Sequence, residues 1–258
     1  MMETDGNGSG TVRPSFPEKC EKGEVIRMEN AEKIENSEMS EIKENIESYP
    51  EREEIEWCNY YARFAHRYDV PRILLIGDSI TNSYNGKVFS FFGSNDAKPA
   101  PGDTAVDVLV SSYGINDPML DTMLKMVLED GKYRYSAIHF NNGLHPHDNP
   151  EGYERGLRRV IGLIRGWQPQ AKLILATSTH VTPRGGSADC LDLKANALTI
   201  GYNDVVRKLA EEYSLPLDDL WTVVAGRGDC PHTDGIHFGP EGVKRLTDAV
   251  VSCLKANL

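Results

Sequence analysis

The amino-acid sequence predicts an α/β fold, a three-layer α/β/α sandwich in which helices cover both faces of a central parallel sheet of about five strands. Two observations predict it. Short apolar runs recur along the chain, which is typical of strands buried on both faces. Longer stretches with helical character separate them, and parallel neighbours need such crossover connections.

The predicted elements can be placed by residue number. The strands are residues 73–76, 106–110, 137–140 and 173–176, with a weaker run near 215–217. The helices are residues 119–129, 151–167, 197–213 and 240–256. Upstream, residues 54–67 also have helical character, because their aromatic residues are spaced so that they could face a core. These residues are Trp57, Tyr60, Tyr61 and Phe64.

Acidic charge is concentrated at the amino-terminal end. The 258 residues carry a formal net charge of −11, and residues 1–54 alone hold 15 Asp or Glu against 7 Lys or Arg. The remainder is nearly balanced. An acidic chain is repelled by nucleic acid and by anionic membranes, so neither is expected as a partner.

Residues 1–54 are predicted to be a partly disordered or helical acidic segment, and residues 55–258 one compact domain. Residues 1–25 are rich in Gly, Ser, Pro and charge, which is typical of disorder. From Glu29 to Glu47 a glutamate recurs at every third position, and this period walks around a helix rather than marking one face. A solvated tail and a docking helix for a partner are the two interpretations.

The sequence also carries hints about location. The amino terminus lacks the basic start and the apolar core of a secretory signal, and no apolar run approaches the roughly 20 residues of a membrane span. We expect a cytoplasmic protein, or a secreted one if a native leader was removed. Five scattered cysteines fit a reducing compartment, although Cys190 and Cys230 could pair. The oligomeric state is left open.

One serine lies where a parallel sheet places its reactive groups. The first predicted strand leads directly into Gly77, Asp78 and Ser79, and ligands bind beyond the carboxyl ends of such strands. A serine at the start of the next helix exposes its hydroxyl, and its backbone N–H has no intrahelical partner, so it can stabilise an oxyanion. The alternative is that Asp78 or Ser79 only caps the helix.

A candidate acid–base pair lies near the other end of the chain. Asp234 and His237 are three residues apart, just before Gly239 and Pro240 open the last predicted helix. A hydroxyl nucleophile needs a general base, and that base needs an orienting carboxylate. One loop can supply both, although Asp-Gly is also a common turn.

Together the two blocks resemble those of the SGNH hydrolase superfamily, the GDSL-like esterases and lipases. Residues 77–79 are similar to its first block and residues 234–237, Asp-x-x-His, to its last. The resemblance covers the chain from about Arg72 to the carboxyl terminus. It implies a flavodoxin-like α/β/α sandwich, in agreement with the strand–helix alternation, and a catalytic triad of Ser79, Asp234 and His237.

The resemblance also implies an oxyanion hole, for which the two middle blocks match less closely. Its donors would be the backbone N–H groups of Ser79 and Gly114 and the side-chain amide of Asn141. The third block of the family reads Gly-x-Asn-Asp, whereas His139 stands here at the position of the glycine. Asn142 is therefore the alternative to Asn141.

A second match to the third block occurs earlier in the chain. Residues 114–117 spell Gly-Ile-Asn-Asp, but they follow the second predicted strand rather than the third, and Pro118 comes next. We interpret Asn116 and Asp117 as turn and cap residues.

Several histidines are interpreted as parts of the pocket rim or wall. His145, His147 and Asp148 lie close together, but their spacing matches no established metal-ligand pattern. His180 and His232 are expected in loops or in the pocket wall. The sequence therefore implies no metal and no organic cofactor.

The resemblance implies a serine esterase that hydrolyses carboxylic esters through an acyl-enzyme, with a small-molecule or carbohydrate ester as substrate. No long apolar lid is apparent, which favours a short acyl group such as acetyl. Two alternatives stay open. One is a lipase or thioesterase, and the other is a catalytically silent carbohydrate-binding or scaffold protein, since the same fold can host different functions.

Overall fold

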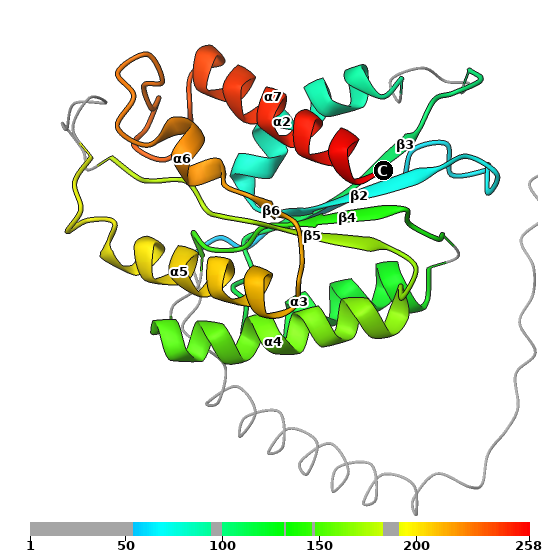
Figure 1. The fold of residues 1–258 in the computed structure, drawn as a ribbon, viewed down its shortest axis with the longest axis horizontal. Coiled ribbons are helices and arrows are strands. Elements are labelled where there is room, and N and C mark those ends of the chain that lie inside the picture. Colours follow the sequence, from blue (N-terminus) through cyan, green and yellow to red (C-terminus); the bar gives the residue numbers. More distant parts are fainter. Residues whose placement is uncertain (1–53, 94–99, 132, 146–147, 183–190) are drawn as a thin grey trace, which may run out of the picture. The chain divides into compact units, whose positions relative to one another are not determined.

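A sheet of six strands forms the centre of the computed structural model (Figure 1), which describes residues 54–93, 100–131, 133–145, 148–182 and 191–258. The strands lie side by side in the order β1-β3-β2-β4-β5-β6. Their bounds are Cys58–Tyr61 for β1, Arg72–Gly77 for β2, Ala105–Ser111 for β3, Ala137–Phe140 for β4, Lys172–Ala176 for β5 and Leu217–Asp218 for β6. The predicted acidic segment, residues 1–54, lies almost wholly outside the described residues and stays a prediction.

The five strands from β2 onward run parallel, which confirms the predicted sheet. Counted along the chain, their spatial order is 2-1-3-4-5, the order of flavodoxin-like sheets. The chain leaves β2 for β3 on one side, and β4 then takes the other side of β2. The topological switch point, where ligands of such sheets bind, therefore lies between the carboxyl ends of β2 and β4.

Helices cover both faces of the sheet (Figure 1). One hydrophobic cluster joins the sheet to α2, α6 and α7, and a second joins it to α3, the π-helix η1, α4 and α5. Their bounds are Ser79–Phe91 for α2, Pro118–Leu124 for α3, Lys125–Glu129 for η1, Pro150–Trp167 for α4, Ala197–Glu212 for α5, Leu220–Val224 for α6 and Pro240–Asn257 for α7. The three-layer α/β/α sandwich is confirmed.

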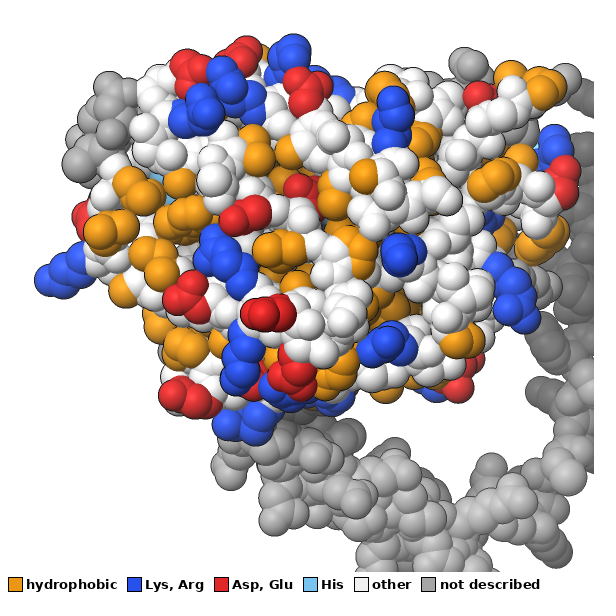
Figure 2. Space-filling view, viewed as in Figure 1, with side chains coloured by type: hydrophobic (Ala, Val, Ile, Leu, Met, Phe, Trp, Pro, Cys, Tyr) orange, Lys and Arg blue, Asp and Glu red, His pale blue; other side chains and the backbone are white. Residues whose placement is uncertain are grey.

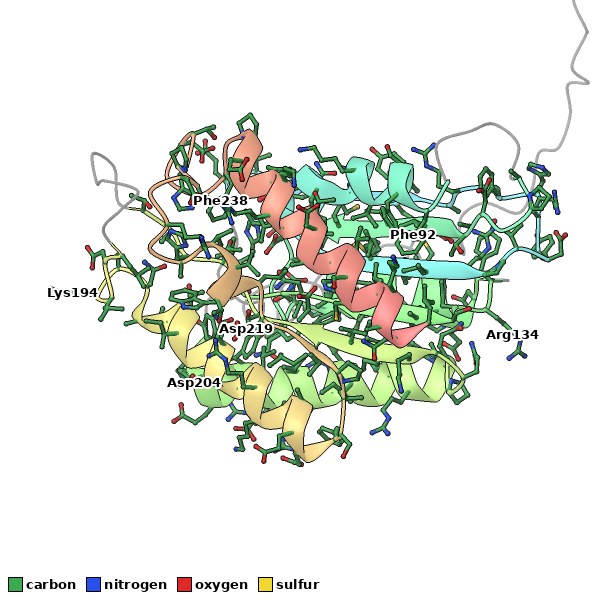
Figure 3. The ribbon with its side chains drawn as sticks, turned by 45° about the horizontal axis from the view of Figure 1, so that its top comes forward. Phe92, Arg134, Lys194, Asp204, Asp219 and Phe238 are labelled. Carbon is green, nitrogen blue, oxygen red and sulfur yellow. The ribbon has the colours of Figure 1, made fainter. Side chains whose placement is uncertain are left out.

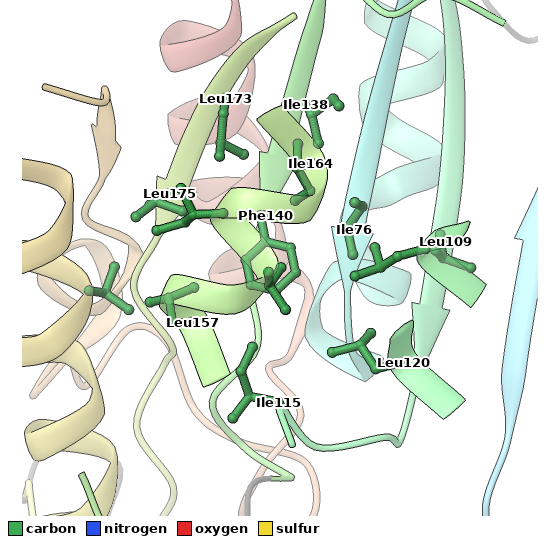
Figure 4. Packing of buried hydrophobic residues seen from close by; sticks show 14 of the residues in the cluster. Ile76, Leu109, Ile115, Leu120, Ile138, Phe140, Leu157, Ile164, Leu173 and Leu175 are labelled. Carbon is green, nitrogen blue, oxygen red and sulfur yellow. The ribbon is translucent and has the colours of Figure 1, made fainter. Parts of the chain in front are cut away.

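Side chains of β2 alternate between the two clusters, as the two-residue repeat of a strand requires. Ile73 and Leu75 pack under α2 and α7, whereas Leu74 and Ile76 pack on the other side. Figure 4 shows this second side, where Ile76 and Phe140 of the sheet lie close to Leu157 of α4. Burial on both faces explains why these strands are continuously apolar.

The predicted helices agree with α4, α5 and α7 to within one residue at each end. The predicted helix 119–129 is instead an α-helix followed by a π-helical turn, and α6 was not predicted because five residues leave little periodicity. No helix among the described residues has both the length and the apolar content that crossing a membrane requires.

Residues 54–67 do not form the predicted helix. Cys58–Tyr61 is a strand that pairs antiparallel with β3 and so extends the sheet by one edge strand. Aromatic residues favour strands where a neighbouring strand offers pairing and packing, and here β3 supplies it. The aromatic spacing suits one side of a helix, but Tyr60 and Tyr61 are exposed in the strand and Phe64 is buried beyond it.

A buried ion pair holds the amino ends of the strands together. Arg72, the first residue of β2, donates from Nη1 to both carboxylate oxygens of Asp107 in β3 at 2.9 and 3.0 Å. Its guanidinium also donates to the backbone carbonyls of Arg63, Phe64 and Arg67. Arg72 therefore fixes the loop after β1 at the end of the sheet opposite to the switch point.

Charges of both signs are mixed over the face of the molecule that Figure 2 shows. Some charges of the molecule form networks, such as the one in which Glu154 of α4 accepts from Arg158 and from Lys208 of α5. This mixture agrees with the nearly balanced charge of the chain beyond residue 54.

Candidate active site

Ser79 follows the carboxyl end of β2 and is the first residue of α2. Gly77 makes the tight exit from the strand possible, because a Cβ there would lie 2.0 Å from Oγ1 of the buried Thr81. Asp78 caps the helix, accepting from the N–H of Ile80 at 2.9 Å. Of the two residues predicted as the cap, Asp78 takes that role. The hydroxyl of Ser79 therefore remains available for chemistry.

The Ser79 side chain is half-buried, and neither its hydroxyl nor its backbone N–H hydrogen-bonds to another described residue. An unused hydroxyl beside an unused N–H at a helix start is the pair of groups that nucleophilic attack and oxyanion binding require. Burial raises the pKa of the neighbouring Asp78, and the charge of His145 and the N–H of Ile80 oppose this rise. His145 therefore lies near Asp78, the neighbour of Ser79.

Asp234 and His237 form a closely coupled pair. His237 Nδ1 lies 2.7 Å from Asp234 Oδ2, and Asp234 Oδ1 accepts from the backbone N–H groups of Ile236 and His237 at 3.0 and 2.8 Å. The ring hydrogen bond, followed by these two backbone N–H groups, holds the pKa of Asp234 well below its usual range. Because an ionised carboxylate only accepts, Nδ1 carries the proton and Nε2 of the neutral ring is a proton acceptor.

The loop that carries this pair lies at the carboxyl end of the parallel strands. Figure 1 shows the segment before α7 at that end of the sheet, and Figure 3 places Phe238 far from Arg134, which precedes β4 at the other end. Phe238, next to His237, and Ile80, next to Ser79, are buried in the same hydrophobic cluster. The two predicted blocks therefore pack on the same face of the sheet.

The structure joins two of the three predicted triad residues by a hydrogen bond. Asp234 and His237 are in contact, whereas Ser79 Oγ makes no hydrogen bond to His237 among the described residues. Such contacts commonly tighten only when substrate is bound. A contact between Ser79 Oγ and the imidazole of His237 stays a prediction.

The two asparagines after β4 have different partners. Asn141 donates from its side-chain amide to the backbone carbonyls of Ala176 and Thr177 at 3.2 and 3.0 Å, so its N–H groups face the end of β5. Asn142 donates to the carbonyl of Tyr113 at 2.9 Å, and its buried Oδ1 has no hydrogen bond among the described residues. Asn142 therefore lies beside the turn that contains Gly114.

Gly114 follows β3 in a turn whose backbone is partly used. Its carbonyl accepts from the N–H of Asp117 at 3.0 Å, and its own N–H has no hydrogen-bond partner among the described residues. The backbone N–H of Gly114 is thus available for its predicted role as an oxyanion donor. It lies beyond the end of β3, the strand next to β2.

Asn116 and Asp117, in the early Gly-Ile-Asn-Asp sequence, make turn and cap contacts, as predicted. Asp117 is the N-cap of α3 and accepts from the N–H of Met119 at 2.8 Å. Asn116 donates to Asp148 and to the carbonyl of Gly152 at 2.8 and 3.0 Å, which ties this turn to the start of α4.

Histidine side chains gather near the candidate site. The rings of His180 and His232 are 4.7 Å apart, and each lies against Phe238. Burial, and then the charge of His232, lower the pKa of His180 to about 4, so His180 is neutral at neutral pH. Both therefore pack around Phe238, the residue after His237, and their place in a pocket wall stays a prediction.

One buried pair was not predicted from the sequence. His139, in the middle of β4, is fully buried and its Nε2 lies 3.0 Å from Asp218 Oδ2 of β6. The only sequence signal was a histidine within an apolar run. Because His139 pairs in register with Leu75 and Ile174, it is a strand residue rather than the counterpart of a turn glycine.

The structure offers no metal site within the described residues, where no three His, Cys, Asp or Glu side chains are arranged to hold an ion. His145 and Asp148 belong to this part of the chain. His147 lies outside it, as does Cys190, so the predicted rim position of His147 and the possible pairing of Cys190 with Cys230 stay untested.

Comparison with known proteins gives a family and a fold. Residues 48–245 match the model of the GDSL-like Lipase/Acylhydrolase family. Among curated proteins, none matches the sequence significantly.

Three solved structures illustrate the similarity of fold. An acetyl xylan esterase, AlAXEase, has 17% identity and a TM-score of 0.55, over 71% of this chain and 99% of its own. An aryl esterase of M. smegmatis has 17% identity and a TM-score of 0.53, over 73% of this chain and 100% of its own. A carbohydrate esterase family 3 protein from Talaromyces cellulolyticus has 14% identity and a TM-score of 0.53, over 72% of this chain and 97% of its own. At these identities the likeness concerns the fold alone.

Proposed function

Because the chain belongs to the GDSL-like lipase/acylhydrolase family, we propose that it is a serine esterase in which Ser79 is the nucleophile, His237 the general base and Asp234 its orienting carboxylate. The observation that carries the proposal is the 2.7 Å hydrogen bond between His237 Nδ1 and Asp234. It fixes the tautomer that presents Nε2 as proton acceptor, which is the state a serine nucleophile needs.

In the proposed reaction, Ser79 Oγ attacks the ester carbonyl carbon while its proton passes to His237 Nε2. The tetrahedral intermediate collapses, the bond to the alcohol oxygen breaks, and the alcohol leaves with the proton from His237. Water then attacks the acyl-enzyme, gives a proton to His237 and releases the acid, and Ser79 regains its proton. Asp234 stays ionised throughout, because its pKa is held well below the usual range.

The oxyanion is proposed to bind to the backbone N–H groups of Ser79 and Gly114 and to one side-chain amide after β4. Asn141 was predicted for this role, with Asn142 as the alternative. The hydrogen bonds favour Asn142, because the amide of Asn141 already donates to two carbonyls at the end of β5 while Asn142 lies beside the Gly114 turn. Losing one such donor typically lowers kcat by about 10²–10³-fold.

For the substrate, we propose a short acyl group such as acetyl on a polar, carbohydrate-like alcohol. The side chains of His237 and Asp234 are 39% and 54% exposed, so the described residues leave this side of the site open. Thr233 and Asp234 are exposed on this rim, together with the apolar Ile236. An open rim that carries polar groups admits a bulky hydroxylated alcohol, and two of the similar structures are an acetyl xylan esterase and a carbohydrate esterase.

The proposal is tested by labelling with a fluorophosphonate, which reacts with an activated serine. The wild-type protein should be labelled, peptide mass spectrometry should place the label on Ser79, and Ser79→Ala should not react. A folded wild-type protein that stays unlabelled and fails to hydrolyse p-nitrophenyl acetate would contradict the proposal and support a silent binding or scaffold protein.

The acyl preference is tested separately with p-nitrophenyl esters of graded chain length and with acetylated sugars. We expect kcat/KM to fall as the acyl chain lengthens beyond a few carbons. A maximum at long chains would favour a lipase, and preference for an acyl thioester over the matched oxygen ester would favour a thioesterase.

A further inference from the structure

The loop of residues 231–239 is internally rigid. Its two sides are joined by an isolated β-bridge between His232 and Phe238, and Gly239 donates to the carbonyl of Pro231 at 2.9 Å. Thr233 donates to the carbonyl of His237 from both its backbone N–H, at 2.7 Å, and its hydroxyl, at 3.0 Å. With the bonds between Asp234 and His237, these contacts link the loop into one hydrogen-bonded unit.

Besides the N–H of Val243 in α7, which donates to the carbonyl of Gly239 at 3.0 Å, two hydrogen bonds tie this loop to other described elements, and both end on one residue, Thr182. The backbone N–H of Thr182 donates to the carbonyl of Gly235 at 2.7 Å. The Thr182 hydroxyl and His232 Nδ1 are hydrogen-bonded at 2.7 Å. The first contact holds the tip of the loop and the second holds its base.

The approach at the tip is close enough to restrict the residue there. Gly235 has a φ of +95°, and a Cβ at this position would lie 2.6 Å from the carbonyl oxygen of Thr182. A glycine is therefore needed both for the backbone conformation and for the contact with Thr182.

Thr182 itself belongs to a segment that helix α5 and its N-cap hold in place. Asn203 of α5 accepts from the N–H of Ser178 at 2.8 Å and donates to its carbonyl at 2.9 Å. Asn196, the N-cap residue of α5, does the same for Val181, at 2.7 and 2.8 Å. Two buried amides thus clamp the backbone on the way from β5 to Thr182.

We infer that Thr182 is a positioning residue that sets where Asp234 and His237 stand relative to Ser79. This inference rests on the proposed function for its effect on rate. The loop carries the base and its carboxylate as one rigid unit, so an error in its placement moves both together. A displacement of about 1 Å in a catalytic group can lower the rate by about 10²-fold, without any loss of the groups themselves.

The side chain is tested with Thr182→Val, which keeps the shape and the backbone N–H but removes the hydroxyl that bonds to His232. We expect kcat for p-nitrophenyl acetate to fall about 10- to 100-fold with KM nearly unchanged. Thr182→Ser, which keeps a hydroxyl, should restore most of kcat. Thr122→Val is the matched control, because it removes a threonine hydroxyl that donates to a backbone carbonyl at an exposed position of α3. It should leave kcat unchanged.

A second variant removes the other partner of this hydrogen bond, His232 Nδ1. His232→Phe keeps an aromatic ring against Phe238 but removes Nδ1, so it should lower kcat to a similar extent. The double variant with Thr182→Val should be no slower than the slower single variant, because both changes break one contact. Multiplied effects in the double variant would overturn the inference.

Hydrogen exchange separates this inference from the proposed function, since it needs no activity. In Thr182→Val the amides of residues 233–237 should exchange faster than in the wild type, while those of α4 and of the central strands do not change. Unchanged exchange in the loop together with full kcat would overturn the role of Thr182. Faster exchange in a protein whose wild type is inactive and unlabelled would uphold the tether and overturn the esterase proposal instead.

Discussion

Asn142 donates from its side-chain amide to the backbone carbonyl of Tyr113 at 2.9 Å, so the turn after β4 is tied to the turn after β3. Gly114, whose backbone N–H is a proposed oxyanion donor, follows Tyr113 directly. Asn141, one residue earlier, donates instead to backbone carbonyls at the end of β5, on the other side of β4. Two adjacent asparagines of the same type thus have different partners, and their substitutions should have different effects.

Asn142→Ala should lower kcat by about 10²–10³-fold, because it removes a proposed oxyanion donor beside Gly114. It should lower the melting temperature less than Asn141→Ala does, because one carbonyl, that of Tyr113, loses its donor rather than two. Asn141→Ala should lower the melting temperature, because two carbonyls at the end of β5 lose their donor in a buried position. Thermal unfolding and kinetics on p-nitrophenyl acetate measure both effects. An unchanged melting temperature with a large loss of kcat in Asn141→Ala would assign the donor role to Asn141.

The triad residues should show graded losses. Ser79→Ala and His237→Ala should reduce turnover of a short p-nitrophenyl ester nearly to background while leaving the circular dichroism spectrum unchanged. Asp234→Asn should lower kcat by about 10⁴-fold, because the amide can favour the wrong tautomer of His237 but leaves the nucleophile and the base in place. Full activity in Ser79→Ala would rule out the proposed mechanism.

His180 should make the protein less stable at acidic pH. Its pKa is about 4 in the folded protein against 6.5 for an ordinary histidine, chiefly because it is buried. Between these values the unfolded chain binds a proton that the folded protein does not, so the free energy of unfolding falls as pH falls from about 6.5 to about 4. The neighbouring His232, whose pKa is also lowered, acts in the same direction.

His180→Phe should reduce this loss, since a phenyl ring fits against Phe238 and Trp221 and binds no proton. Urea unfolding at pH 7.5 and pH 4.5 gives the difference for each protein. His66→Phe, at an exposed position, is the control for the substitution itself. An equal pH dependence in wild type and His180→Phe would contradict the prediction.

Removing the buried guanidinium of Arg72 should destabilise the fold without touching the candidate site. Arg72→Met leaves the Asp107 carboxylate buried and unpaired, which typically costs about 3–5 kcal/mol of the free energy of unfolding. The double variant Arg72→Met with Asp107→Leu should regain part of this loss, because it also removes the buried charge. Lys244→Met, which breaks an exposed pair with Asp248 on α7, should leave stability nearly unchanged in the same denaturant titration.

The sequence by itself determined the parallel sheet and the location of the two main blocks. Strands buried on both faces must be continuously apolar, and the runs near Ile73 and Val106 are local enough to recognise without any partner. Asp234 and His237 are three residues apart, so their contact is also local. The cap role of Asp117 was predictable for the same reason, since it depends only on the next two residues.

The tertiary structure decided whatever depends on distant neighbours. Cys58–Tyr61 is a strand because β3 offers it an edge, although its aromatic spacing also suits a helix. His139 meets Asp218 across 79 residues of chain, and Thr182 meets Gly235 and His232 about 50 residues away. Such contacts leave no periodic pattern in either segment, because each partner is set by which strands and loops pack together. The partners of Asn141 and Asn142 differ for the same reason: successive side chains of an extended chain point in opposite directions, here towards the end of β5 and towards the turn after β3.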